Sequence, residues 1–363
     1  LPRRRGFAPA QAIALGFGAA ILVGTALLML PFSSRSGVWT NFVDALFTST
    51  SAVCVTGLIV VDTATYWSPF GKVVILLLIQ LGGLGIMLFA ALIGFALARK
   101  LSVRSRIFAG TETKSTGVGD MKRTAIGILI TTLIIEAAVA TVLFVRFWTG
   151  YDYDVGRAAW HAVFHAVSSF NNAGFALYTD SLIGFVSDPW ICIPICIAII
   201  LGGLGFPVLR QLRKEFRNQL HWSMNTRIVV VATLVLLTLG TGFTVVVEWN
   251  NPGTLRPLDP ASRMLAGFFH SVQARTAGFN SVDTSLMHDE TWLVTDVLMF
   301  IGGGPAGTAG GIKVTTFAVL LFIMWTEFRG GTALNAFGKR FSRSVHREAT
   351  TVVIVALAAV TSA

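Results

Sequence analysis

Apolar residues form long blocks along this chain, with short polar stretches between them. Seven blocks predict membrane passes, because a hydrocarbon core of about 30 Å needs about 20 helical residues; they lie at 11–31, 70–98, 124–148, 189–209, 227–247, 291–326 and 348–363. The pattern therefore predicts an all-α integral membrane protein.

Three further segments are too short and polar to span a membrane, yet too apolar for solvent loops. They resemble one another and read FTSTSAVCVTGL at 47–58, FHAVSSFNNAGF at 164–175 and FFHSVQARTAGF at 268–279. In each, a phenylalanine stands ten residues before a glycine, Gly57, Gly174 or Gly278. Repeats of this kind indicate an internally repeated architecture.

A second sequence motif recurs in the membrane pass that follows each segment. It reads LGGLGI at 81–86, LGGLGF at 201–206 and IGGGPAG at 301–307. The repeated unit is therefore a helix, a short descending helix at 40–52, 158–170 or 261–273, a glycine turn and a second helix.

The repeat period predicts pseudo-fourfold repeats of helix, re-entrant pore loop and helix around a central pore. Filter glycines are separated by 117 and then 104 residues, so a fourth falls beyond Ala363 and the fourth repeat is expected to be incomplete here. The predicted parts are a cytoplasmic N-terminus at 1–10, repeat 1 at 11–100, a cytoplasmic loop and repeat 2 at 101–223, repeat 3 at 224–330, and a loop with the first helix of repeat 4 at 331–363.

The three glycines suggest a cation filter. Irregular backbone at membrane depth is tolerated only when buried in protein or lining water, and a ring of carbonyls can replace the hydration shell of K⁺. Glycine suits such a turn because it adopts φ values that are costly with a Cβ. The predicted potassium-binding residues are Val55, Thr56, Gly57, Asn172, Ala173, Gly174, Thr276, Ala277 and Gly278. Tight turns within a helical bundle are the alternative.

A glycine-rich run interrupts the second helix of the third unit and cannot form a rigid helix. We expect a flexible gate loop beneath the filter, formed by Gly302, Gly303, Gly304, Pro305, Ala306, Gly307, Thr308, Ala309, Gly310 and Gly311, with Lys313 beside it. A kink that allows close helix packing is the alternative.

Two charged residues lie near this zone, where intramembrane charge suggests function. Arg275 either braces the filter, against an aspartate or backbone carbonyls, or limits ion occupancy by repulsion. Lys313 either positions the gate loop or snorkels to the inner face.

The distribution of charged residues predicts how the chain is oriented in the membrane. Most of the 28 Lys and Arg lie in 3–5, 99–123, 210–227 and 329–347, and positive loops stay in the cytoplasm. The N-terminus is thus expected inside, and the aspartate-bearing loops outside, where negative charge concentrates cations. Because the basic residues follow membrane topology, the net charge of +10 does not indicate nucleic-acid binding.

The remaining motifs do not indicate a dinucleotide, metal or catalytic site. Gly302, Gly304 and Gly307 match G-x-G-x-x-G but lack the strand–helix context of a dinucleotide site. The pairs His161/His165 and Cys192/Cys196 have helical spacing without a metal motif, and no catalytic triad is visible, so we do not expect an enzyme. An ion-coupled secondary carrier for a small solute is the main rival, although its repeats are commonly inverted.

Together the segments TSAVCVTGL, SSFNNAGF, VQARTAGFNSVD and FIGGGPAGTAGGIKVTTF resemble the Trk/Ktr/HKT superfamily of potassium transporters, and most closely the membrane subunits of bacterial Ktr systems. The resemblance implies four units around one pore and an intramembrane gate loop. Some sodium-conducting plant members carry serine at the first filter position, where this chain has Gly57, which favours potassium.

The resemblance also implies partners that the residues themselves do not show. These are a homodimer in the bacterial plasma (inner) membrane, a cytoplasmic nucleotide-binding regulatory ring of the KtrA type, and potassium, with sodium as a second candidate ion. ATP or ADP is expected on the regulatory partner only, and no covalently bound cofactor is expected here. The basic loops 99–123 and 327–347 are either docking surfaces for that ring or simply solvated.

Overall fold

Helices make up nearly all of the regular structure. The structure, a computed structural model, describes residues 9–109, 118–329, 335–336, 339–340, 350–356 and 358. Parts of the predicted N-terminal stretch, the basic loops and the last predicted pass lie outside these residues. The all-α prediction holds apart from two short antiparallel strands, β1 (Asn335–Ala336) and β2 (Lys339–Arg340).

The helices follow the predicted alternation of long and short elements. The first stretch of chain holds α1 (Pro9–Met29), α2 (Phe42–Val53) and α3 (Pro69–Ala109). The second holds α4 (Val118–Gly150), α5 (Val155–Phe170), α6 (Pro189–Leu204) and α7 (Phe206–Glu215). The third holds α8 (Met224–Glu248), α9 (Pro260–Gln273), α10 (Asp289–Phe300) and α11 (Val314–Phe328). Residues 350–356 are also helical.

Length and composition identify the membrane-crossing helices among the described residues. Three helical stretches are long and apolar enough to span, at Pro69–Ala91, Lys122–Gly150 and Met224–Glu248, and the bent pair α6 and α7 would count as a fourth. Ala14–Met29 and Val314–Thr326 are apolar but shorter. The predicted passes at 70–98, 124–148 and 227–247 thus overlap candidate spans, whereas 291–326 is divided between α10 and α11 by a non-helical loop.

The three short helices α2, α5 and α9 begin at the same kind of cap. Asn41 Oδ1 accepts a hydrogen bond from Val43 N, Asp154 from Arg157 N, and Asp259 from both Ala261 N and Ser262 N. Such side chains satisfy backbone donors that a helix start leaves free, which stabilises a helix by about 1 kcal/mol. A polar cap before an apolar run therefore explains why these helices start where they do.

The pass predicted at 189–209 is not continuous. Helix α6 ends at Leu204, and α7 leaves at an angle of 104°. Gly205, between them, has a φ of 89°. Pro207 has no N–H to donate to the carbonyl of Gly203 and its ring opposes a continued helix. The LGGLGI motif in α3 lacks this proline, so the same glycines remain helical there.

The described chain divides into two compact units. Unit 1 contains Leu1–Ile199 and Ala277–Ser281, and unit 2 contains Ile200–Thr276 and Val282–Ala363. All three glycines of the predicted filter therefore belong to unit 1, and the glycine-rich loop belongs to unit 2. The predicted repeat boundaries stay a prediction.

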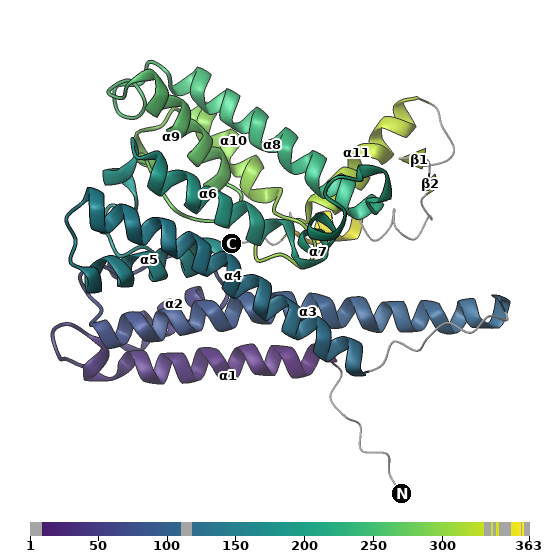
Figure 1. Ribbon diagram of the computed structural model, residues 1–363, viewed down its shortest axis with the longest axis horizontal. Helices are drawn as coiled ribbons and strands as arrows, with labels where there is room; N and C mark the ends of the chain where they lie inside the picture. Colours follow the sequence, from purple (N-terminus) through teal and green to yellow (C-terminus); the bar gives the residue numbers. More distant parts are fainter. Residues whose placement is uncertain are drawn as a thin grey trace, which may run out of the picture. The chain divides into compact units, whose positions relative to one another are not determined.

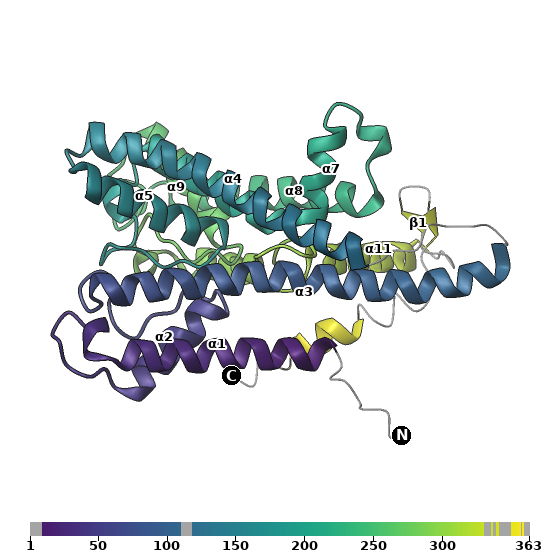
Figure 2. The same ribbon diagram turned by 60° about the horizontal axis from the view of Figure 1, so that its bottom comes forward.

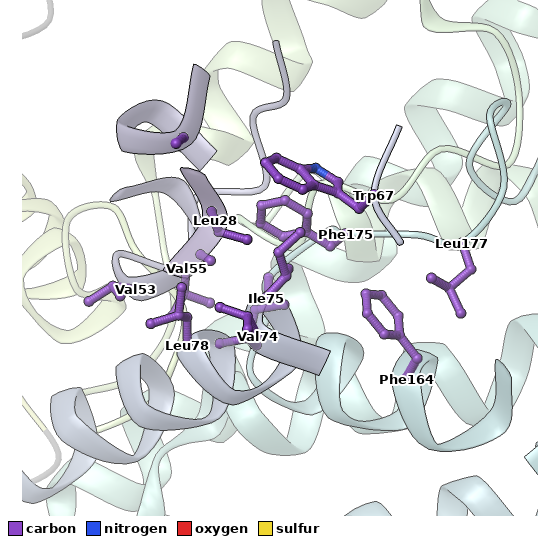
Figure 3. Close-up of a cluster of buried hydrophobic side chains, with 14 residues drawn as sticks. Leu28, Val53, Val55, Trp67, Val74, Ile75, Leu78, Phe164, Phe175 and Leu177 are labelled. Atoms are coloured by element: carbon purple, nitrogen blue, oxygen red, sulfur yellow. The ribbon is translucent and has the colours of Figure 1, made fainter. Parts of the chain in front are cut away.

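Unit 1 is built around one apolar core. Helices α1, α2 and α3 pack on one another (Figures 1 and 2), and α4 packs on α5. Figure 3 shows that Leu28, Ile75 and Phe164, from α1, α3 and α5, contribute to a single buried cluster. The same cluster includes Val55 and Phe175 from the segments that follow α2 and α5. The two glycine-bearing segments therefore share a core.

Unit 2 has a smaller core around the helix break. Leu204 and Val208 lie on either side of Gly205 and pack with Val229 of α8 and with Ile301 and Val314, which flank the glycine-rich loop. Both ends of that loop are thus held by apolar contacts.

Replacing Phe164 by alanine tests the shared core. Its side chain is fully buried in unit 1, so Phe164→Ala should cost about 3–5 kcal/mol of folding stability and lower the thermal unfolding midpoint of detergent-purified protein. The neighbouring exposed Val163 supplies the control, because Val163→Ala should leave the midpoint nearly unchanged. Equal effects of the two substitutions would contradict the packing.

Candidate functional site: three glycine turns and a glycine-rich loop

Each short helix ends in a turn with the same backbone signature. Two residues in every turn have left-handed φ angles, the glycine and the residue two positions before it. The pairs are Val55 (56°) with Gly57 (80°), Asn172 (58°) with Gly174 (71°), and Thr276 (70°) with Gly278 (77°). Left-handed φ is uncommon for residues with a Cβ and is found at turns and functional sites. Three repeats of one strained pattern make these segments equivalent.

The first two turns use the same hydrogen bonds. After α2, Val55 N donates to Ala52 O and Thr56 N to Ser51 O; after α5, Asn172 N donates to Ser169 O and Ala173 N to Ser168 O. This is the Schellman arrangement, which satisfies helix carbonyls through a left-handed residue. The third turn differs, since Arg275 N donates to Val272 O and the left-handed residue comes one position later.

The three glycines come together within unit 1. A Cβ on Gly57 would lie 2.5 Å from Ala173 O, and a Cβ on Gly174 would lie 2.7 Å from Ala277 O. A Cβ on Gly278 would lie 3.4 Å from Gly174 Cα and 3.9 Å from Thr56 O. A side chain at Gly57 or Gly174 would therefore displace a backbone carbonyl, whereas at Gly278 its Cβ would make only ordinary contacts.

The predicted filter residues differ in exposure. Four are buried (Val55, Asn172, Ala173 and Ala277), three are half-buried (Gly57, Gly174 and Thr276), and two are exposed (Thr56 and Gly278). Eight of the nine belong to unit 1, and Thr276 belongs to unit 2. Their binding of potassium stays a prediction.

The second and third segments are also tied together beyond the glycines. Leu182 N donates to Asn280 O at 2.8 Å, and Asn280 N donates to Ser181 Oγ at 3.0 Å. These contacts join chain positions about a hundred residues apart, so the close approach of Gly174 and Gly278 has independent support.

A charged group lies beyond the first turn, in the loop before α3. Burial raises the pKa of Asp62, but hydrogen bonds from Thr65, from Ala64 N and from Thr179 outweigh it, so the pKa is below its ordinary value. The carboxylate therefore stays negative at neutral pH. It also links the loop after the first turn to the loop after the second.

The glycine-rich loop is non-helical between α10 and α11, as the sequence predicts. Its backbone is bonded to the end of α6: Gly304 N donates to Gly203 O at 2.8 Å and Thr308 N to Gly202 O at 3.0 Å. These carbonyls lie in the last turn of α6, where no helical N–H follows because of the break at Gly205. The broken pass, which the sequence analysis missed, thus provides the loop's anchor, and Pro207 was the available signal.

Arg275 and Lys313 both donate to carbonyls of this loop. Arg275 is buried, and its guanidinium donates to Gly302 O at 2.9 Å, a carbonyl of the glycine-rich loop, so its predicted role in bracing the filter stays a prediction. Lys313 Nζ donates to Ala309 O at 2.6 Å. Thr276 Oγ1, next to Arg275, accepts from Gly310 N at 2.8 Å. Both ends of the loop are therefore held by side chains.

The remaining candidate motifs have ordinary surroundings. His165 is buried with Nδ1 2.7 Å from His161 O, and His161 Nδ1 lies 2.9 Å from Tyr178 Oη. Cys192 and Cys196 are buried free thiols. Within the part of the chain that the structure describes, no group of three His, Cys, Asp or Glu could hold a metal.

The sequence analysis did not predict a buried polar cluster that lies next to the second turn. Glu136 of α4, Gln80 of α3 and Asn171 at the end of α5 are mutually hydrogen-bonded. Glu136 is the single carboxylate in the apolar block 124–148, and that isolation was a signal of function.

Together these features define a multi-pass helical membrane protein with three short helices that end in equivalent, converging glycine turns. A family model described as TrkH, cation transport protein, matches residues 18–341. The chain belongs to this family of cation transport proteins, so the predicted family resemblance is confirmed. Membership in a transporter family also fits the expectation of a non-enzyme.

Curated relatives extend the likeness over most of the chain. The Ktr system potassium uptake protein B of Bacillus subtilis is 40% identical, covering 89% of this chain and 72% of its own length. The protein of the same name from Vibrio alginolyticus is 37% identical, covering 97% and 76%. The potassium/sodium uptake protein NtpJ of Enterococcus hirae is 38% identical, covering 98% and 78%.

A solved structure shows the same fold. The crystal structure of the potassium transporter TrkH from Vibrio parahaemolyticus has a TM-score of 0.75, at 18% identity, and the match covers 99% of this chain and 71% of that one.

Substitution of Gly205 tests the anchor of the glycine-rich loop. A Cβ there would collide with Pro305 O, and the φ of 89° already disfavours alanine. Gly205→Ala should therefore cost more than about 2 kcal/mol and increase backbone hydrogen exchange across 302–311. Gly37 is the matched control, since its φ is 70° but nothing lies within 4 Å; Gly37→Ala should cost only about 1 kcal/mol. Equal losses would argue against the anchor.

Proposed function

We propose that this chain is the ion-conducting membrane subunit of a potassium uptake system, with a filter made of backbone carbonyls at the three glycine turns. The observation that carries the proposal is the convergence of three left-handed turns, in which Ala173 O lies against Gly57 and Ala277 O lies against Gly174. Two curated relatives are named as potassium uptake proteins and a third as a potassium/sodium uptake protein, which supports the choice of ion.

The proposed chemistry is exchange of water for protein oxygens. K⁺ sheds its hydration shell, and carbonyls of residues 55–57, 172–174 and 276–278 replace it. Helices α2, α5 and α9 end directly before these segments, so each adds roughly half a negative charge at its C-terminal end. The ring requires a fourth equivalent strand, which the family resemblance implies.

The glycine-rich loop is the proposed gate. It is irregular, yet its backbone is bonded to α6 and its ends are held by Arg275 and Lys313. A loop that is fixed by a few hydrogen bonds can have a second arrangement at moderate cost, as a gate requires. The packing-kink alternative predicts that loosening the loop harms folding without increasing flux.

Regulation, assembly and orientation belong to the same proposal. We expect a homodimer in the bacterial plasma membrane, with the N-terminus inside and a cytoplasmic ring of the KtrA type that binds ATP or ADP and acts on the gate. The names of two relatives refer to a Ktr system, which supports a multi-component complex. The name of the Enterococcus relative supports sodium as a second ion.

Gly57→Ser is the test of the filter. The new Cβ would lie 2.5 Å from Ala173 O in a left-handed backbone, so the carbonyl must shift. In a bacterial host that lacks its own potassium uptake, the preference for K⁺ over Na⁺ should fall about tenfold, equivalent to about 1.4 kcal/mol.

The control for this experiment is Gly37→Ser, which places serine at a similar φ where there is open space. It should keep the potassium preference of the unsubstituted protein. An unchanged preference in Gly57→Ser, at normal expression, would count against the filter.

Lys313→Met is the test of the gate. It removes the bond to Ala309 O and so frees one end of the loop; a charged hydrogen bond contributes about 1.5–3 kcal/mol, so basal K⁺ flux without the regulatory partner should rise about tenfold. Lys72→Met is the matched control, since Lys72 Nζ donates to Ala64 O at 2.7 Å in a different loop. Reduced or unchanged flux in Lys313→Met would favour the packing kink.

A further inference from the structure

Glu136 is an acid placed in an apolar helix. It lies near the middle of the candidate span Lys122–Gly150, and its side chain is only 6% exposed. Burial of a carboxylate in a membrane segment is expensive, and such residues usually face the protein interior and serve function. The proposed transport scheme gives this residue no role so far.

The carboxylate is held by amides alone. Gln80 Nε2 donates to Oε2 at 3.3 Å and Asn171 Nδ2 donates to Oε1 at 3.1 Å. The salt bridge found among the described residues is Arg146–Asp188, so Glu136 has no basic partner there. A carboxylate that accepts bonds from two different helices can fix both side chains in one orientation.

Asn171 occupies the point at which α5 becomes the second glycine turn. It is the C-cap of the helix, and Asn172, with its left-handed φ, follows directly. Its Nδ2 also contacts Gln80 Oε1 at 3.0 Å and Val167 O at 2.9 Å. A rotation of this side chain would therefore disturb the first residue of the turn.

A glycine on α3 completes the site. A Cβ on Gly83 would overlap Asn171 Oδ1, which is itself buried and has no hydrogen-bond partner among the residues that the structure describes. The Oδ1 atom therefore makes no hydrogen bond that would fix the side chain in this position. The hydrogen bonds of Nδ2 hold it there. Since Nδ2 faces Glu136, Gln80 and Val167, the acid on α4 is one of three acceptors that determine this orientation.

We infer that Glu136 is a positioning residue for ion selection. It acts through Asn171 and Gln80, which fix the start of the second glycine turn and hence the carbonyls of 172–174. The inference rests on the proposed filter. It assigns the role to hydrogen bonding through both carboxylate oxygens, so a glutamine, which has an N–H₂ group in place of one oxygen, can accept only one of the two bonds.

The test compares ion preference in Glu136→Ala and Glu136→Gln of the full-length protein. Two readouts are used: K⁺ against Na⁺ preference of uptake in the deficient host, and the thermal midpoint of purified protein in KCl against NaCl. In Glu136→Ala, the preference for K⁺ over Na⁺ should fall about tenfold. The thermal midpoint should also no longer be higher in KCl than in NaCl. Glu136→Gln should lose the preference and the midpoint difference too, because its N–H₂ group would face one of the two amide donors.

Two further variants separate this role from general stability. Gln80→Met keeps the volume but removes both amide contacts, so it should reproduce the loss of preference even if Glu136→Ala does not fold. Thr132→Val, one turn earlier on α4 and equally buried, should change neither readout.

Normal ion preference in folded Glu136→Ala and Gln80→Met would overturn the inference. An unchanged ion preference in Glu136→Gln would overturn it too, because an N–H₂ group would then face an amide donor without effect. Failure of the proposed function looks different: the unsubstituted protein would show neither K⁺ uptake nor a K⁺-specific midpoint.

Discussion

Irregular backbone inside a membrane must find partners for its polar groups within the protein, because hydrocarbon offers none. The structure meets this constraint at two places. The glycine turns close the ends of α2 and α5 through bonds to helix carbonyls, and the glycine-rich loop bonds to the end of α6. The proposed filter would use carbonyls of the glycine turns, because carbonyl oxygens can replace the water around a dehydrated cation.

The same constraint explains why glycine is concentrated at these points. Gly57 and Gly174 combine left-handed φ with a neighbouring carbonyl where a Cβ would lie. Gly205 has the same combination beside the loop. Every other residue would add strain and displace the backbone. In this protein glycine therefore determines how closely separate segments approach, in addition to how each turn is formed.

Polar side chains hold the second glycine turn and the glycine-rich loop in place by hydrogen bonds. Asn171 bridges α3, α4 and α5 beside the second turn, while Arg275 and Lys313 hold the loop in unit 2. Buried polar groups of this kind are costly unless bonded, so they favour one arrangement over alternatives. An apolar core alone, as in the cluster around Phe164, would stabilise the helices without specifying the carbonyl positions.

The sequence by itself determined the helical class, the short helices and the family, because long apolar runs and repeated glycine motifs can be recognised without knowing which segments meet in space. It did not determine the break at Gly205, where one proline overrides a repeated motif, or the partners of Arg275 and Glu136. Those depend on which distant segments meet: Asn171 lies 35 residues from Glu136 and 91 from Gln80. Only tertiary packing brings such groups within hydrogen-bond distance, since the chain between them imposes no fixed separation.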